Sequence, residues 1–267
     1  MKGSTKTRSF RNWFEKLREH HKLVMERNNK TYEKTIENKE ERPFAYGLCF
    51  SKLFWLFFFG SLLGTILETM WAVIVDGHFE MRVGMVIGPF IPIYGGGAVL
   101  ITLCLYKLHN MHGIVIFLAS AVIGASFEFF CSFFQELILG TVSWDYSDTP
   151  LNIDGRTNVF YAAIWGVLGY FWVRYIYPFI SRLIEKIPKT PGRQLAVILF
   201  VTMALVGVLT NVAIARKNKR AENIPPKTFI GEFCDAVFTD DYMDIIFPHM
   251  GTKESFAEER RQKENGH

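Results

Sequence analysis

Two glutamates lie within long apolar runs of this 267-residue chain, and each follows a glycine by four residues. The first run reads Gly64-Thr-Ile-Leu-Glu68, and the second, sixty residues later, reads Gly124-Ala-Ser-Phe-Glu128. A carboxylate at membrane depth costs about 3 kcal/mol on insertion scales and persists where it faces a partner, a cavity or a pathway. Such carboxylates can bind a cation or relay a proton, so we predict that the functional site lies around these two glutamates.

A polar loop between residues 144 and 156 supplies further candidates for the site, namely Asp145, Asn152 and Arg156. Because a guanidinium fork suits carboxylates, Arg156 is expected to pair with Asp145, Asp148 or one of the two intramembrane glutamates. The acids of this loop resemble ligands for a hard cation, but their spacing is not that of an EF-hand. Asn-x-Asp-Gly is also typical of a turn, so we predict an ordered interfacial loop and no metal site.

These side chains must be positioned by membrane-spanning helices, because the apolar residues cluster in runs of about 20 residues or more, the length that crosses a bilayer. The sequence predicts an all-α, polytopic membrane protein with about five spans. We place them at Leu53–Val75, Gly84–Leu105, Ile114–Leu139, Val159–Leu183 and Leu195–Ala215. Residues 53–215 would form the transmembrane domain, between polar segments at 1–52 and 216–267.

The second predicted span is unusual because it contains two prolines and five glycines within fourteen residues. The candidates for backbone roles here are Gly88, Pro89, Pro92 and Gly95, and Tyr94 between them is a candidate for the polar pathway. Irregular backbone at membrane depth is tolerated only where protein or a water-filled cavity covers it. The segment is therefore either a broken or re-entrant helix, or a proline-kinked helix whose glycines allow close packing.

The two Gly-x-x-x-Glu runs also suggest an internal duplication. Gly64 and Glu68 share one face of the first predicted helix, and Gly124 and Glu128 share one face of the third. Each of these helices is followed by a special loop and by a span rich in glycine or aromatic residues. Small residues let helices approach closely, so both glutamates are expected to converge on one bundle interior. The similarity of the two runs reflects either a duplicated pair of hairpins or a coincidence.

The polar segments carry opposite charges. Residues 1–52 contain 13 Lys and Arg against 7 Asp and Glu, whereas residues 221–267 contain 5 against 10. The basic segment predicts attraction to anionic lipids, not binding to nucleic acid, and residues 9–27 fit either an interfacial amphipathic helix or a solvated one. Four cysteines form no C-x-x-C pair, and the first fifty residues lack the apolar core of a cleavable signal peptide.

Several motifs together resemble one known family, the type IV ABC-transporter permeases (CmpB-like). They cover about residues 53–185 in the family's order and spacing: Gly-x-x-x-Glu-Thr at 64–69, Gly-Pro-Phe-x-Pro-Ile-Tyr-Gly at 88–95, Trp-Asp-Tyr-Ser at 144–147, Asn-x-x-Gly-Arg at 152–156 and Trp165-Gly166. Where the family has Asn-Arg-Gly before the second motif, this chain has Arg82-Val83-Gly84. The resemblance implies a permease component of a transporter.

The chain contains no G-x-x-x-x-G-K-[S/T] phosphate-binding loop, so no nucleotide cofactor is predicted and an ATP-driven transporter would need a separate ATPase subunit. Three functions stay open. The favoured one is transport through a polar pathway formed by the two glutamates, Arg156 and the broken second span. The second is an intramembrane enzyme in which Glu is the general base and Arg156 holds a lipid phosphate. The third is a non-catalytic scaffold. A homo-oligomer is compatible with all three functions.

Basic residues near the span ends predict a multi-pass protein of the cell membrane with its amino terminus in the cytoplasm. On that side lie Lys107 and the basic residues between the fourth and fifth spans, and on the other side only Arg82 and Arg156 precede the end of the last span. The basic residues after the fifth span oppose this orientation. The carboxyl terminus would be outside.

Overall fold

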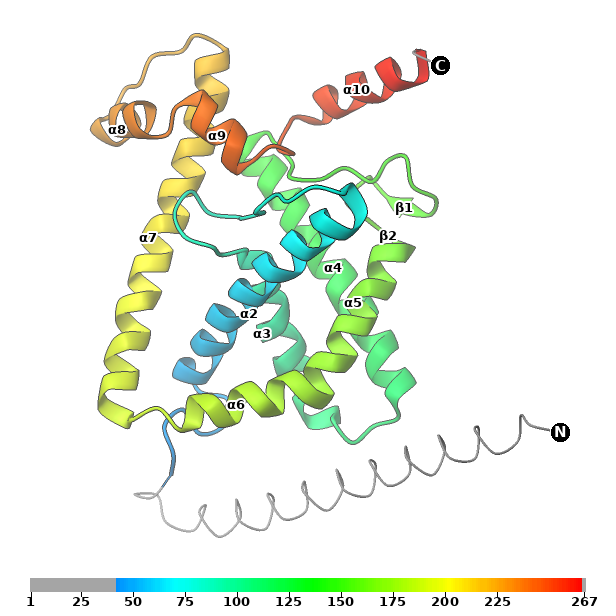
Figure 1. The fold of residues 1–267 in the computed structure, drawn as a ribbon, viewed down its shortest axis with the longest axis vertical. Coiled ribbons are helices and arrows are strands. Elements are labelled where there is room, and N and C mark those ends of the chain that lie inside the picture. Colours follow the sequence, from blue (N-terminus) through cyan, green and yellow to red (C-terminus); the bar gives the residue numbers. More distant parts are fainter. Residues whose placement is uncertain (1–41, 266–267) are drawn as a thin grey trace, which may run out of the picture.

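A computed structural model describes residues 42–265 of the chain as an almost entirely helical bundle (Figure 1). The helix expected over residues 9–27 lies outside these residues. Within the described part, four helical segments are long and apolar enough to cross a membrane, and a shorter apolar segment spans Pro92–Leu108. The prediction of a polytopic helical membrane protein is confirmed, with one of the five predicted spans formed by a short helix.

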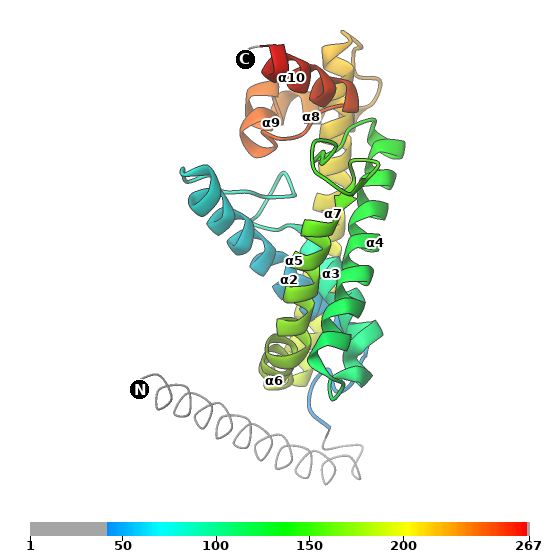
Figure 2. The same cartoon turned by 90° about the vertical axis from the view of Figure 1, so that its right-hand side faces the viewer.

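The bundle is built from two helix pairs and a final long helix. α2 packs against α3, and α4 packs against α5, each pair joined by a loop. Their bounds are α2, Phe50–Trp71; α3, Pro92–Leu105; α4, Gly113–Leu139; α5, Val159–Phe171; and α7, Lys189–Ala221. In Figure 2 the axes of α4, α5 and α7 run in nearly the same direction, whereas α2 leans away from them.

α7 shows where the bilayer must lie. Its residues 194–215 carry no charged side chain, and Arg193 and Arg216 flank them. These 22 residues rise about 33 Å at 1.5 Å per residue, close to the roughly 30 Å hydrocarbon core of a bilayer. Large apolar side chains such as Leu205 and Val208 are exposed along this stretch. In a membrane these positions face lipid.

The second predicted span is only partly helical, because α3 begins at Pro92 rather than near Gly84. Proline suits the first helical position because its fixed φ and missing N–H fit there. The preceding residues are irregular, and Gly88 has a left-handed φ of 88°. This corrects the expected span Gly84–Leu105 and rules out a continuous, kinked helix.

The irregular segment contacts three helices and is covered by protein at Met85 and Val86, whereas Ile87, Gly88 and Pro89 are exposed. The Val86 backbone N–H donates to Thr210 Oγ1 at 3.1 Å, and Thr210 lies about 9 Å inside the charged end of α7 by helix rise. Tyr242 donates to the Val86 carbonyl at 2.8 Å, and Thr65 donates to the Pro89 carbonyl at 2.9 Å. Backbone polar groups at this depth are thus satisfied by side chains, as a re-entrant segment requires.

The fourth predicted span bends before its end. After a π-helical turn at Trp172–Ile176, α6 (Tyr177–Glu185) runs across the base of the bundle (Figure 1). The fully buried Lys52 of α2 holds it there, because its ammonium donates to Glu185 Oε1 and Ser181 Oγ, both at 2.6 Å. The first α-helical part of this span, α5, therefore ends at Phe171, before the expected end at Leu183.

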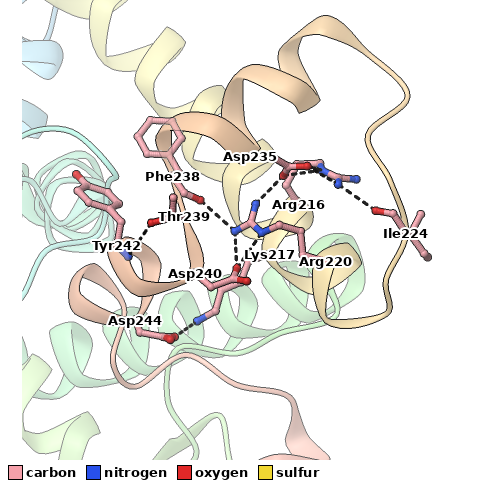
Figure 3. Close-up of polar contacts among 10 residues, drawn as sticks. All are labelled: Arg216, Lys217, Arg220, Ile224, Asp235, Phe238, Thr239, Asp240, Tyr242 and Asp244. Carbon is pink, nitrogen blue, oxygen red and sulfur yellow. Dashed lines mark hydrogen bonds and ion pairs between the residues drawn. The ribbon is translucent and has the colours of Figure 1, made fainter.

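Residues 216–265, expected as a polar tail, continue α7 and then form three short helices. These are α8 (Phe229–Val237), α9 (Asp240–Ile246) and α10 (Lys253–Asn265). Figure 3 shows how α7 holds α8 and α9. Arg216 binds Asp235 at 2.6 Å, Arg220 binds Asp235 and Asp240 at 2.6 Å each, and Lys217 binds Asp244.

Candidate functional site

The first glutamate is positioned by a close contact between α2 and α3. A Cβ atom at Gly64 would lie 2.6 Å from Tyr94 Cβ, so only glycine admits this tyrosine against α2. One helical turn further, the Tyr94 hydroxyl donates to Glu68 Oε1 at 2.5 Å. Arg82, from the re-entrant segment, places Nη1 3.4 Å from Glu68 Oε2. Glu68 therefore has a phenol and a guanidinium as partners.

The second glutamate is positioned in the same way by α4 and α5. A Cβ atom at Gly124 would lie 2.5 Å from Trp165 Cβ, and Glu128 follows one turn later. Its carboxylate accepts hydrogen bonds from Thr157 Oγ1 at 2.8 Å and from Tyr146 Oη at 3.2 Å. Only 6% of Glu128 is exposed, so both oxygens are satisfied by neutral donors in a buried position.

Aromatic rings connect the two halves. Tyr94 stacks on Trp165 with ring centroids 5.9 Å apart, so the two rings that fill the glycine notches touch each other. Burial raises the pKa of Tyr146, and the carboxylates of Glu128 and Glu68 both add to this rise. Both charges therefore act on one hydroxyl. We call Glu68, Glu128 and their direct partners, Tyr94, Arg82, Tyr146 and Thr157, the glutamate cluster.

The depth of the cluster follows from contacts between α4 and α7. Asn218 donates to the Leu139 carbonyl at 2.8 Å, so the end of α4 lies just beyond the charged end of α7. Glu128 precedes Leu139 by eleven residues, or about 16 Å of helix. The half-thickness of a hydrocarbon core is about 15 Å. Along α4, Glu128 thus lies about as far from this end as the half-thickness of a hydrocarbon core, and its position inside the membrane stays a prediction.

Arg156 is paired with carboxylates, but not with the ones expected. Its guanidinium binds Glu136, and its Nε donates to Asp154 Oδ2 at 2.8 Å. Nη1 donates to Ser132 Oγ at 3.3 Å. The predicted partners Asp145, Asp148, Glu68 and Glu128 were wrong, because the turn at Asp154-Gly155 directs Arg156 toward the end of α4. Arg156 therefore borders the glutamate cluster and supports the loop.

Asp145 and Asn152 also bind within the loop rather than at the glutamates. Asn152 Oδ1 accepts from the Gly155 N–H at 3.0 Å in the turn that joins the two-residue strands β1 (Asn152–Ile153) and β2 (Thr157–Asn158). Asp145 accepts from the Ser147 N–H at 2.9 Å and pairs with Arg260 of α10 at 2.5 Å. This loop also carries Tyr146 and Thr157, so these contacts hold the donors of Glu128 in place.

The remaining candidates shape the backbone around α3. Gly95 lies against the Phe57 carbonyl and Ser61 of α2. Pro89 accepts the Thr65 hydrogen bond, and Gly88 and Pro92 form the turn into α3. Within residues 42–265, no group of three or more His, Cys, Asp or Glu side chains could hold a metal ion.

Residues 55–211 match the family described as "Putative ABC-transporter type IV". This match covers more than half of the chain and includes both helix pairs of the glutamate cluster. The chain belongs to this family. It is thus a multi-pass component of a membrane transporter. No curated protein and no solved structure matches the chain.

The type IV match continues beyond the resemblance seen in the sequence and takes in most of α7. It excludes α8, α9 and α10. Arg82, one position away from the arginine expected from the resemblance, lies 3.4 Å from Glu68.

Sequence reasoning missed several members of the cluster. Tyr146 was assigned to the membrane interface, yet it donates to Glu128, and Thr157 was not singled out. Trp165 was noted only as part of a motif. The available signal was their position: each lies in or next to a family motif and has a polar or aromatic group suited to a buried carboxylate or a glycine notch.

Proposed function

We propose that this chain is a permease component in which the glutamate cluster binds a positively charged species, a proton or a small cation, during transport. One observation carries the proposal: two matched glycine-glutamate turns, one from each helix pair, converge on a shared cluster within the apolar bundle. Intramembrane carboxylates that face a bundle interior are typical of ion pathways and proton relays.

The partners of the two glutamates support binding of a cation. Arg82 is the cation bound to Glu68, at 3.4 Å, whereas the contacts of Glu128 are neutral hydroxyl groups. A buried carboxylate without a countercharge is costly. A transported cation or a proton would compensate the charge of Glu128, with Tyr146 and Thr157 reorienting their hydroxyl groups around it.

The contacts of Arg156 do not support the alternative function as an intramembrane enzyme. That function requires an arginine to hold a lipid phosphate, and the Arg156 side chain is only 6% exposed and bound by Glu136 and Asp154. A phosphate would have to displace two carboxylates from a buried guanidinium. The scaffold alternative stays distinct, because it predicts that ion flux does not depend on either glutamate.

The test is ion flux in proteoliposomes made with the purified chain and its co-purifying partners. A pH-sensitive dye inside the vesicles reports protons, and a sodium-sensitive dye reports a small cation. Glu128→Gln should lower the flux by about 100-fold, the order that a positioned proton-transfer group contributes, and Glu68→Gln should lower it less. Glu222→Gln, at an exposed residue after α7, is the matched control. Equal flux in all four proteins would refute the proposal.

We also propose a separate ATPase subunit as the energy source, since the family is one of ABC transporters and the sequence contains no phosphate-binding loop of its own. Mass spectrometry of the protein purified in native lipids should detect an ATPase in fixed proportion to the chain. Purification without any ATPase, under conditions that preserve flux, would contradict this assignment and leave the role of the glutamates standing.

For the orientation, we propose a cytoplasmic amino terminus. The end of the bundle that contains α6 carries Arg182, Lys186, Lys189 and Arg193 close together in the chain, which favours the cytoplasmic side. Cysteines introduced at the exposed positions Lys186 and Glu258 test this with an impermeant reagent on intact cells. We expect the reagent to label only the Glu258→Cys protein. If it labels only the Lys186→Cys protein, the orientation is the opposite of the proposed one.

A further inference from the structure

α8 presents three different faces around its nine residues. Gly231 and Cys234 are buried against α7, and the acidic residues Glu232 and Asp235 lie on a second side. The third face is apolar and exposed. Its side chains are Phe229, Ile230, Phe233 and Val237, with exposed fractions of 81, 56, 45 and 48%. Helical spacing places these four on one side of the helix, and we call them the α8 apolar face.

The α8 apolar face has a fixed orientation. Arg216 and Arg220 of α7 both bind Asp235, and the Arg220 guanidinium also reaches the Phe238 carbonyl at 3.0 Å (Figure 3). Thr228 caps the helix by accepting from the Gly231 N–H at 3.1 Å. The helix is thus held on α7 by ion pairs and by buried Cys234, and it cannot roll to bury its apolar side chains.

The depth of α8 is set by the residues of α7 that it touches. A Cβ atom at Gly231 would lie 3.5 Å from Arg216 Cδ, and Cys234 belongs to one apolar cluster with Ala213 and Ile214. Arg216 is the first charged residue after the uncharged stretch of α7. α8 therefore crosses α7 where that helix leaves the hydrocarbon core, and it projects away from the other spans (Figure 1).

We propose that α8 lies in the membrane interface and inserts its apolar face among the acyl chains of the bilayer. We assign this face to lipid because it continues the exposed apolar surface of α7. Side chains of α7 such as Val208 and Leu205 are exposed and face lipid in a membrane, and α8 begins at the end of this stretch. An amphipathic helix at this depth buries its apolar side a few ångströms into the headgroup and acyl boundary. Lys227 stands next to the amino end of α8, where it can reach lipid phosphates.

This inference goes beyond the proposed transport function, because it concerns residues outside the part of the chain that matches the family. It would make α8 an anchor that fixes the end of α7 and, through Tyr242 of α9 and its bond to the Val86 carbonyl, the height of the re-entrant segment. A second copy of the chain is the alternative occupant of the apolar face, and the test distinguishes the two.

The experiment uses spin labels on the full chain in vesicles of phosphatidylcholine and phosphatidylglycerol. Cys49, Cys104 and Cys131 are replaced, and buried Cys234 is kept. Labels are introduced by Phe233→Cys and, as a second apolar position, Ile230→Cys, with Glu232→Cys on the same helix as the matched control. Accessibility is then measured to oxygen, which concentrates in lipid, and to a water-soluble nickel chelate.

We expect the labels at 230 and 233 to have an oxygen-to-chelate accessibility ratio several-fold higher than the label at 232. Three labels that all favour the chelate would show that the face lies in water and would overturn the proposal. Labels at 230 and 233 that are shielded from both reagents, with spectra that broaden as the density of labelled protein increases, would assign the face to a second copy and would overturn it as well.

Discussion

The close packing at the repeated Gly-x-x-x-Glu motif predicts that a substitution at Gly124 destabilises the protein. Gly124→Ala adds one methyl group, and its Cβ would lie 2.5 Å from Trp165 Cβ, where carbon atoms normally stay about 3.5–4.0 Å apart. Trp165 cannot simply retreat. Its ring packs against Gly97 of α3 on the far side, where a Cβ atom would lie 2.7 Å from Cζ3, and it stacks on Tyr94.

The magnitude is the difference of two opposing effects. Replacing a glycine inside a helix by alanine stabilises the helix by about 1 kcal/mol. Overpacking a filled core costs about 1–3 kcal/mol, and the upper part of that range applies because Trp165 is held on both sides. We expect Gly124→Ala to lower the free energy of unfolding by about 1–2 kcal/mol, which corresponds to a few degrees in Tm for a domain of this size.

Gly207→Ala is the matched control, because it lies within α7 and its Cβ would meet only Met85 Cε, at an ordinary 3.9 Å. That variant should be neutral or more stable by up to about 1 kcal/mol. Thermal unfolding of both proteins in the same detergent measures the difference. If Gly124→Ala is as stable as Gly207→Ala, the glycine notch is not tightly filled and the geometric account of the repeat is wrong.

Two further predictions concern ion pairs. Lys52→Met should destabilise the protein by about 3–5 kcal/mol, because it removes the buried ammonium that binds Glu185 at 2.6 Å, and Lys52→Met with Glu185→Leu should recover most of this loss in thermal unfolding. Arg260→Gln should increase hydrogen exchange in residues 143–158, since it frees Asp145. Burial alone would raise the pKa of Asp145, but bonds from Ser147 and Arg260 lower it. The stabilisation is thus present above the unfolded pKa near 3.9 and should be lost as the pH falls further. If protection, corrected for the intrinsic pH dependence of exchange, does not fall at acidic pH, the prediction is wrong.

Much of the bundle could be predicted because lipid imposes simple rules on sequence. Runs of apolar residues located four spans. The cost of an intramembrane carboxylate is the reason why Glu68 and Glu128 were chosen as candidates, and their functional role stays a prediction. The prolines and glycines of the second span predicted either a broken or a proline-kinked helix. The start of α3 at Pro92 was beyond that prediction, because it depends on hydrogen bonds from Thr65 and Thr210 in other helices.

The partners of the loop residues could not be predicted from spacing. Arg156 had several carboxylates within a few residues, and the choice of Glu136 and Asp154 depends on the turn and on the position of α4. Likewise, the acidic composition of residues 221–267 suggested a tail. Their acids instead bind the basic end of α7, so the opposite charges of adjacent segments were the overlooked signal for a folded structure.

The repeated motif gives both glutamates the same local geometry but different surroundings, and this difference bears on function. Glu68 is partly exposed, at 28% of its side chain, and Arg82 supplies a countercharge. Glu128 is buried and held by hydroxyl groups that can donate or accept. A site that must bind and release a cation benefits from the second arrangement, since neutral partners neither repel the cation nor replace it. Under the proposed function, Glu128 would therefore bind the transported charge, and Glu68 with Arg82 would form the more accessible approach to it.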